Sequence, residues 1–438
     1  MSTTYTEAKP IPKDRWLRII PPMIVIYIIA YMDRMNISFA MAGGMNQALG
    51  ITATVSGLAA GIFFAGYLVL QIHGGHIAEH GSAKKFIFWT IIGWGGTSIL
   101  TGFVQNGWQL LLVRFLLGVA EGGIWPAILV SISNWFPEEE CGRANAFFMS
   151  SLALAAVVTS PLTGWIVGVF SWRYVFFIEG AISLALIFVW LPLFADRPEE
   201  AKWISKEEKE YLAGRLRSER EGFKHRDKVA VSYKQLLADC NLWKLTLIYF
   251  CNQVGQYGFL LWLPTILKGL TKVGMTKIGF LAAAPYLVAL PGLYIFSVLA
   301  DKRMNRRLWT CLTECGFALF CLLAALFSNH IWLSYSFIVM TGMFTKAPAA
   351  IFWVLPRTLF QPGVSGTARG FINAVGCLGG LVGPFLVGWM STLFSMKAGM
   401  FCLVGFLFAG GFLTLTLPDI TAGVKPLADL KRESVGAR

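Results

Sequence analysis

The chain has 438 residues, of which 56% are hydrophobic and only 14% are charged, and its mean hydropathy is +0.61. Soluble domains carry about 25% charged residues, so this composition excludes an ordinary soluble fold. The formal net charge of +13 could suggest a nucleic-acid partner, but an excess of Lys and Arg is also typical of the cytoplasmic loops of membrane proteins. We therefore expect a lipid bilayer as the surroundings and no nucleic-acid partner.

Apolar runs long enough to cross a bilayer recur along the chain, because a spanning helix needs about 20 apolar residues. The first six runs lie at residues 18–40, 55–78, 86–105, 107–132, 144–168 and 171–194. A polar segment follows, in which a broken helical period is typical of an amphipathic linker: Ile204, Tyr211, Leu212 and Leu216. Six more runs lie at residues 241–267, 276–299, 308–328, 331–355, 366–392 and 397–417. The pattern predicts an all-α membrane protein with twelve transmembrane helices.

The two sets of six runs resemble each other, which indicates a duplicated chain. Glu79 and Asp301 follow the second and eighth runs and are 222 residues apart, while Pro161 and Pro384 are 223 residues apart. Two parallel six-helix halves with a site between them are one known transporter architecture. The expected parts are a first half over 1–195, a cytoplasmic linker over 196–240, a second half over 241–420 and a cytoplasmic tail over 421–438.

Positive charge alternates from loop to loop and predicts the orientation of the chain. One set of loops, on the same side as both termini, carries Lys84, Lys85, the basic residues between 197 and 244, Lys302, Arg303, Arg306 and Arg307. The other set carries only Arg173, Lys268, Lys272, Lys277 and Lys397. Cytoplasmic loops are the richer in Lys and Arg, so both termini are expected inside the cell. The start of the chain has no small-residue cleavage site, so we expect no cleaved signal peptide.

Four ionisable residues interrupt the apolar runs of the first half. Asp33 and Arg34 lie in the first run, while Arg114 and Glu121 lie in the fourth, seven residues apart and so on one helical face. A charge at the bilayer centre costs from about 2.5 kcal/mol upward, which makes each of them a functional candidate. Arginine binds a carboxylate through two hydrogen bonds and a buried acid can load and release a proton, so the set suits a proton-coupled anion carrier. The alternative is that all four only form ion pairs that hold the helices together.

The tenth run contains Lys346, which we expect to be the only buried charge of the second half. It could bind an anion there, or its side chain could extend toward the membrane surface. Polar and aromatic residues at similar depth are Tyr31, Tyr67, Asn252, Gln253, Tyr257, Trp353 and Asn373. Aromatic side chains in spans often serve only for packing, whereas Asn373 precedes a glycine-rich run where helices can approach closely.

Metal, nucleotide and catalytic motifs are not indicated. His73, His76 and His80 share a helical face, but no acid or cysteine has the spacing to complete a metal site. The eight cysteines include no C-x-x-C pair, and the chain has neither a Walker A loop nor an H-E-x-x-H motif. We expect no metal and no cofactor, with the proton gradient as the energy source.

Two stretches resemble signatures of the major facilitator superfamily. GGHIAEHGSAKK at residues 74–85 is similar to that family's gating loop, G-x-x-x-D-R-x-G-x-R/K, and the stretch from Arg114 to Gly122 is similar to R-x-x-x-G-x-x-E-G. The resemblance implies a gating role for Gly75, Glu79, Lys84, Lys85 and, by the repeat, Asp301. Glu79 and His80 replace the usual Asp and Arg, so the pairing of this loop is expected to depend on pH.

Further stretches, including YMDRMN, SWRYVFFIEG and FINAVGCLGGLVGP, resemble the bacterial anion:cation symporter family. Its members include proton-coupled importers of sugar acids such as galactonate, and of tartrate. The resemblance implies that Asp33 and Glu121 are proton-coupling acids. Substrate-binding roles are implied for Arg34, Arg114, Tyr31, Tyr67, Trp353 and Asn373. It further implies a monomeric importer of a small organic anion, such as a sugar acid, in the bacterial inner membrane. Leu152, where relatives can have glutamine, and Lys346 depart from the family pattern.

Other functions stay open. An organophosphate or organic-anion antiporter would use the arginines, but the seventh run has no second central arginine. A drug or metabolite exporter would be expected to have a glycine-rich fifth run, which here is SLALAAVVTSPLTG. A non-transporting nutrient receptor would normally carry an extended cytoplasmic domain. A membrane-embedded enzyme would need a nucleophile and a base at usable spacing, and none is evident.

Overall fold

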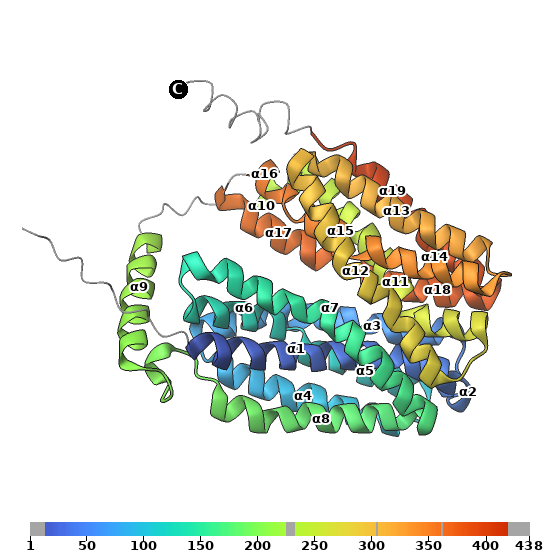
Figure 1. Ribbon diagram of the computed structural model, residues 1–438, viewed down its shortest axis with the longest axis horizontal. Helices are drawn as coiled ribbons and strands as arrows, with labels where there is room; N and C mark the ends of the chain where they lie inside the picture. Colours follow the sequence, from blue (N-terminus) through green and yellow to red (C-terminus); the bar gives the residue numbers. More distant parts are fainter. Residues whose placement is uncertain (1–13, 225–232, 304, 361, 419–438) are drawn as a thin grey trace, which may run out of the picture.

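The computed structural model describes residues 14–224, 233–303, 305–360 and 362–418, and in these ranges it contains helices and no strands (Figure 1). The first half consists of α1 (Asp14–Ala40), α3 (Ala53–His80), α4 (Ala83–Phe103), α5 (Gly107–Glu121), α6 (Ile124–Trp135), α7 (Glu138–Val169) and α8 (Trp172–Leu193). The second half consists of α11 (Cys240–Thr271), α12 (Met275–Arg303), α13 (Arg306–Leu326), α14 (Ile331–Thr345), α15 (Ala347–Phe352), α16 (Leu355–Leu359), α17 (Pro362–Gly376), α18 (Gly379–Leu393) and α19 (Met396–Thr414).

The predicted all-α membrane fold is confirmed. Eleven helical segments of the described chain are long and apolar enough to cross a membrane. Helices α5 and α6 together form one of them, as do α17 and α18. The twelfth, α11, has 32 residues but is less apolar because Asn252, Gln253 and Gln256 lie near its centre. It packs against α17, α18 and α19 inside the bundle, as a spanning helix of the second half would.

Short polar side chains begin many of the helices. Ser82, Asn106 and Ser171 each accept a hydrogen bond from a backbone N–H in the first turn of the helix that follows. The first N–H groups of a helix have no partner inside the helix, so such residues stabilise a helix start. These residues explain why the observed helices begin within a few residues of the predicted apolar runs.

The helices form two groups that meet along glycine-containing seams. In Figure 1 the blue-to-green helices lie below the yellow-to-red ones. Helix α3 packs on α18 and α7 packs on α12. A Cβ on Gly57 would lie 2.3 Å from the carbonyl oxygen of Pro384, and one on Gly164 would lie 2.6 Å from the Cα of Gly279. At both places the two backbones touch because no side chain separates them.

These seams lie at one end of the bundle. We call this the loop end; it contains the short connections around residues 41–52, 104–106, 170–171, 272–274, 327–330 and 394–395. The opposite end, where the linker leaves α8 and enters α11, is called the linker end. At the loop end Thr54 Oγ1 lies 2.9 Å from Thr392 Oγ1, and Lys268 Nζ donates a hydrogen bond of 2.6 Å to the carbonyl of Ala42. The two halves are therefore held together at the loop end.

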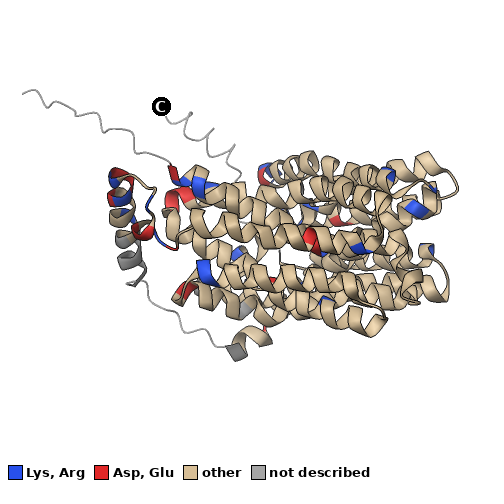
Figure 2. Ribbon diagram, turned by 90° about the horizontal axis from the view of Figure 1, so that it is seen from below, with Lys and Arg blue, Asp and Glu red and all other residues tan. Residues whose placement is uncertain are grey.

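The linker docks on the first half through helix α9 (Lys206–Lys224), which lies across the end of the bundle in Figure 1. The buried side chain of Arg15 forms ion pairs with Glu140 of α7, at 2.6 Å, and with Glu208 of α9. Trp203 stacks on Trp135 with ring centroids 5.2 Å apart. Figure 2 shows that charged residues gather at this end and that few lie along the middle of the bundle.

Candidate functional site

An ion pair joins the first and fourth spans in the interior of the first half. Arg34 Nη2 of α1 lies 3.2 Å from Glu121 Oε2 of α5, and the two side chains are 8% and 0% exposed. The guanidinium of Arg34 lies 5.0 Å from the ring centroids of both Phe63 and Tyr67 on α3, where cation–π attraction stabilises it. Arg34 Nε and Glu121 Oε1 have no hydrogen-bond partner among the described residues. The pair is therefore only partly satisfied.

Arg114 is fully buried on α5 and binds backbone carbonyl groups. Its guanidinium donates to the carbonyl oxygens of Ala59 at 3.4 Å, Asp33 at 3.3 Å and Arg34 at 3.5 Å. Its side chain thus joins α5 to α3 and to the part of α1 that carries the two charged residues. In this arrangement Arg114 positions the site, and its predicted contact with substrate stays a prediction.

Asp33 is fully buried and accepts its hydrogen bonds from neutral side chains. Ser98 of α4 donates to Oδ1 and Ser183 of α8 donates to Oδ2, both at 2.6 Å. Asn36, one turn further along α1, donates to Oδ1 at 3.3 Å. The carboxyl group therefore connects α1, α4 and α8, and it has no arginine or lysine as a direct partner in the described chain.

Glycine explains how α5 comes close enough to α3 to bring these charges together. A Cβ on Gly118 would lie 2.0 Å from the carbonyl oxygen of Phe63, which is closer than any real Cβ contact. Gly118 lies one turn from both Arg114 and Glu121, so the spacing R-x-x-x-G-x-x-E-G places the two charged residues beside the point of closest approach.

Glu179 of α8 is a buried acid of this region that the sequence analysis did not identify. Its side chain is 0% exposed; Oε1 accepts a hydrogen bond of 2.7 Å from Thr163 of α7, and Oε2 has no hydrogen-bond partner among the residues that the structure describes. It precedes Ser183 by one helical turn. The sequence signal for Glu179 is a single acid inside an apolar run, FFIEGAISL.

The second half contributes polar and aromatic groups. Lys346 is half-buried at the break between α14 and α15, and Arg34 lies close enough for the two positive charges to repel each other. Trp353 packs on Tyr249 with ring centroids 4.9 Å apart, and Asn373 accepts a hydrogen bond of 3.7 Å from the Cys377 thiol. The expectation that Lys346 is the only buried charge of this half is wrong, because Glu314 of α13 is also fully buried.

Aromatic residues predicted to line the site lie close to the ion pair. Tyr67 lies beneath Arg34, and Tyr31 is buried one turn before it, with a hydroxyl that has no partner among the described residues. Phe64 and Tyr257 contact each other across the two halves, with ring centroids 4.3 Å apart. Of the predicted site residues, the structure thus brings Arg34, Glu121 and Tyr67 into direct contact.

The predicted gating loop is bound to the end of α8. Ser82 Oγ and the backbone N–H of Lys84 donate to the two carboxylate oxygens of Asp196, at 2.5 and 2.7 Å. Lys85 and Glu79 are exposed, and Gly75 is half-buried. Asp301 at the corresponding place in the second half forms an exposed ion pair with Arg306 at 2.9 Å. Asp196, the partner that holds this loop, was not predicted from the sequence.

No metal-binding group of three or more His, Cys, Asp or Glu residues occurs in the described ranges. The imidazole rings of His76 and His80 lie 4.3 Å apart, and the Nδ1 atom of His80 lies 3.2 Å from the carbonyl of His76. No two cysteines of the described ranges form a disulfide bond.

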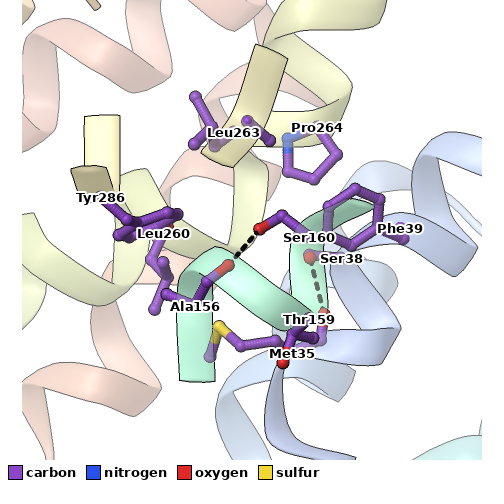
Figure 3. Close-up of a pocket in the computed structure, with 11 residues that line it drawn as sticks. Met35, Ser38, Phe39, Ala156, Thr159, Ser160, Leu260, Leu263, Pro264 and Tyr286 are labelled. Carbon is purple, nitrogen blue, oxygen red and sulfur yellow. Dashed lines mark hydrogen bonds between the residues drawn. The ribbon is translucent and has the colours of Figure 1, made fainter. Parts of the chain in front are cut away.

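A small cavity lies between the halves, lined by residues of both (Figure 3). It is lined by Met35, Ser38, Phe39, Ala156, Thr159, Ser160, Leu260, Leu263, Pro264, Ala282 and Tyr286. It holds at most about one water molecule. The Ser38 and Ser160 hydroxyls donate to the carbonyls of Met35 and Ala156. No charged residue lines this cavity, so it is not an anion site in this arrangement.

This helical arrangement matches a known protein family and a solved structure. The family model described as Major Facilitator Superfamily matches residues 23–384, with a second match over residues 245–435. A solved bacterial homolog of the human lysosomal transporter Spinster, in an inward-facing and occupied conformation, superposes with a TM-score of 0.75. That match covers 92% of this chain and 97% of the other chain at 16% sequence identity, so it supports a shared fold and nothing more specific.

Two curated relatives are similar over nearly their whole length. A "Putative tartrate transporter" of Agrobacterium vitis is 34% identical over 425 residues, which are 95% of this chain and 92% of that protein. A "Quinolone resistance transporter" of Acinetobacter baumannii is 31% identical over 412 residues, which are 91% of this chain and 92% of that protein.

Proposed function

The chain belongs to the Major Facilitator Superfamily, and from this membership we propose that it imports a small organic anion together with protons. The observation that carries the proposal is the partly satisfied pair between Arg34 and Glu121. Removing one partner from a buried ion pair costs about 3–5 kcal/mol. Arg34 can therefore release Glu121 only when another anion takes its place and a proton neutralises the acid.

This exchange couples the substrate to the proton. A substrate carboxylate binds the guanidinium of Arg34 through two hydrogen bonds, while Glu121 takes up a proton and loses its negative charge. Asp33 is the second coupling acid, because its hydrogen bonds to Ser98 and Ser183 connect its protonation to the packing of α4 and α8. Both acids lie beside the backbone that Arg114 holds in place.

The substrate class we propose is a small carboxylate with hydroxyl groups, such as a sugar acid or tartrate. A relative named as a putative tartrate transporter supports this choice. Arg34 and Lys346 come from opposite halves and repel each other, so an anion between them lowers the energy of both. Such an anion would bring the halves together in the manner that alternating access requires.

The proposed location is the bacterial inner membrane, with both termini and the linker in the cytoplasm, as the distribution of Lys and Arg favours. Cys240 is exposed at the linker end, and Gly274 is exposed at the loop end. A membrane-impermeant maleimide should therefore label Cys240 only after cells are opened, whereas a Gly274→Cys variant should be labelled in intact cells. Labelling of Cys240 in intact cells would reverse the proposed orientation.

Uptake into proteoliposomes tests the function. Radiolabelled tartrate, galactonate and aromatic acids are supplied with and without an inward proton gradient, beside Glu121→Gln protein. We expect gradient-stimulated uptake of a hydroxy acid that is lost in the variant, and a Glu207→Gln variant on the exposed face of α9 serves as the matched control. Uptake that ignores the gradient and survives Glu121→Gln would contradict the coupling.

The same liposomes distinguish the two rival transport modes. The similarity to a quinolone resistance transporter favours testing an exporter, for which an outward-directed quinolone flux would replace acid uptake. An antiporter would instead require a counter-anion inside the vesicles. Acid uptake that needs no internal anion and is driven by protons supports symport over both alternatives.

A further inference from the structure

A buried acid in the second half lies apart from the network around Arg34. Glu314 of α13 is 0% exposed, and neither of its carboxylate oxygens has a hydrogen-bond partner in the part of the chain that the structure describes. Among the described residues, Glu314 takes part in no ion pair with Lys, Arg or His. An isolated buried carboxylate is very costly, so this group is stable only when it carries a proton or binds a cation.

A second buried polar group lies beside this acid. Asn252 of α11 is 3% exposed, and neither the nitrogen nor the oxygen of its side-chain amide has a hydrogen-bond partner within the described ranges. Asn252 and Glu314 line one narrow pocket together with Ile248, Tyr249, Thr310, Pro348, Ala349 and Phe352. A protonated carboxyl group can donate to the Asn252 amide oxygen and satisfy both residues after a small side-chain rotation.

The size of the pocket favours a proton over a metal ion. The space does not admit a water molecule, and a Cβ on Gly410 of α19 would lie 2.6 Å from Glu314 Oε1. A sodium or calcium ion needs several oxygen ligands and room for itself. Among the lining residues only Glu314, Asn252, Thr310 and Tyr249 carry side-chain oxygens, and Thr310 already donates to the carbonyl of Arg306.

In the described chain, the helices around Glu314 supply few titratable groups, and no Lys, Arg or His pairs with it to hold it ionised. Cys251 and Tyr249 face it from α11, and Cys311 and Cys315 lie on its own helix. Helix α19 presents Gly410, and α15 presents Pro348 and Ala349. We propose that Glu314 and Asn252 form a proton-binding site of the second half, which holds one proton in this arrangement and exchanges it during the transport cycle.

Exchange is possible because the pocket borders a break in the tenth span. Pro348 and Ala349 lie two and three residues after Lys346, in the first turn of α15, which begins where α14 ends. Tyr249 stacks on Phe352 at 5.5 Å and also contacts Trp353. A movement of α15 would therefore open the pocket beside Trp353, which the sequence analysis assigned to the substrate cavity, and water could then reach Glu314.

Infrared spectroscopy of the full chain in lipid bilayers tests whether the proton is bound. A protonated carboxyl group has a carbonyl band separate from that of a carboxylate. The difference between wild-type and Glu314→Gln spectra at neutral pH should contain one such band, and the difference between wild type and Glu207→Gln should not. If Glu314→Gln does not fold, Asn252→Leu serves instead, because loss of the hydrogen bond should shift the same band. The proposal is overturned if neither variant alters this region, or if sodium in place of potassium removes the band.

That Glu314 exchanges its proton during transport rests on the proposed proton-coupled uptake. The reversal potential of transport in proteoliposomes tests this exchange, because it gives the number of protons carried per anion. Glu314→Gln cannot release a proton, so the number of protons carried per anion should fall by one. If the number of protons per anion is unchanged in Glu314→Gln while the infrared band is present, the proton is permanently bound and the proposed exchange is overturned. The infrared result does not depend on transport, so a failure of the proposed function is recognised separately, by wild-type protein that shows no proton-driven uptake.

Discussion

Arg34 has surroundings that suit a guanidinium better than an ammonium group. Its planar group lies against the rings of Phe63 and Tyr67 while one of its nitrogens pairs with Glu121. A guanidinium stacks on aromatic rings and offers two parallel donors to a carboxylate, whereas a lysine ammonium is a point charge. The shape of the group therefore contributes to binding as well as its charge.

Substitution of Arg34 by lysine should weaken substrate binding although the charge is kept. A hydrogen bond to a charged group contributes about 1.5–3 kcal/mol, so the substrate concentration for half-maximal uptake should rise about 10- to 100-fold. Concentration-dependent uptake of the acid identified in the liposome panel measures this. Arg303→Lys, an exposed arginine at the linker end, is the matched control and should behave as wild type. An unaltered concentration dependence in Arg34→Lys would exclude two-bond recognition at this residue.

Buried charges could be predicted from the sequence only in part. Asp33, Arg34, Arg114 and Glu121 stood out because each interrupts an apolar run, and all four are buried in the structure. Glu179 and Glu314 interrupt apolar runs in the same way and were overlooked. Which charges pair is not evident from spacing, since Arg34 pairs with Glu121 while its neighbour Asp33 binds serine hydroxyls from two other helices.

At the scale of helices, close backbone contact positions the charged residues. Helix α5 lies against α3 where Gly118 meets the carbonyl of Phe63, the residue whose ring faces both Arg34 and Arg114. Small residues allow helices in membranes to approach in this way. The position of the Phe63 ring relative to Arg34 therefore depends on the absence of a Cβ atom at residue 118.

Gly118→Ala should force α3 and α5 apart. Overpacking costs about 1–3 kcal/mol, so we expect a lower melting temperature in bilayers or detergent and weaker uptake, because Phe63 moves away from Arg34. Gly96→Ala on α4 is the control, since a Cβ there meets nothing within 4 Å. Equal melting temperatures for the two variants would mean that α3 and α5 accommodate the added Cβ with no loss of stability.

Glu208→Gln should loosen the linker from the first half. The change removes a charged partner of the buried Arg15, which corresponds to about 1–3 kcal/mol. Limited proteolysis should then cleave within α9 faster than in wild type, while Glu207→Gln, which alters the exposed neighbour, should leave the rate unchanged. Equal cleavage of all three proteins would argue against docking through Arg15.

Helix positions were predicted from hydropathy to within a few residues, but their interruptions were not. The first span continues past Ala40 through a π-helical segment at Met41–Met45, and the tenth span is broken at Lys346 and again after Phe352. Average hydropathy does not register a local change in hydrogen bonding. The breaks depend on packing between helices and on the prolines that follow them, at Pro348 and Pro356.

For the whole molecule, the seams at the loop end determine which side is closed. The contacts of α3 with α18 and of α7 with α12 join the halves there, and the carrier must separate them to accept a solute from that side. At glycines in both seams the backbones of the two halves meet directly, with no side chain between them.

A crosslink across the loop end should stop transport. The Thr54 and Thr392 hydroxyls lie 2.9 Å apart, so a Thr54→Cys, Thr392→Cys double variant should form a disulfide under mild oxidation. Uptake is expected to fall to the background and to recover after reduction, while each single variant should be insensitive to oxidation. A crosslinked protein that still transports would show that the loop end does not need to open.

Helix α9 lies across the end of the bundle and is bound by Arg15 of α1, which also forms an ion pair with Glu140 of α7. Because α1 and α7 both belong to the first half, any tilt of that half must turn the axis of α9 through the same angle. A rigid dye attached to the exposed face of α9 would then report the tilt through the polarisation of its fluorescence. The orientation of one half could be followed in single carriers during turnover, with no probe placed inside the bilayer.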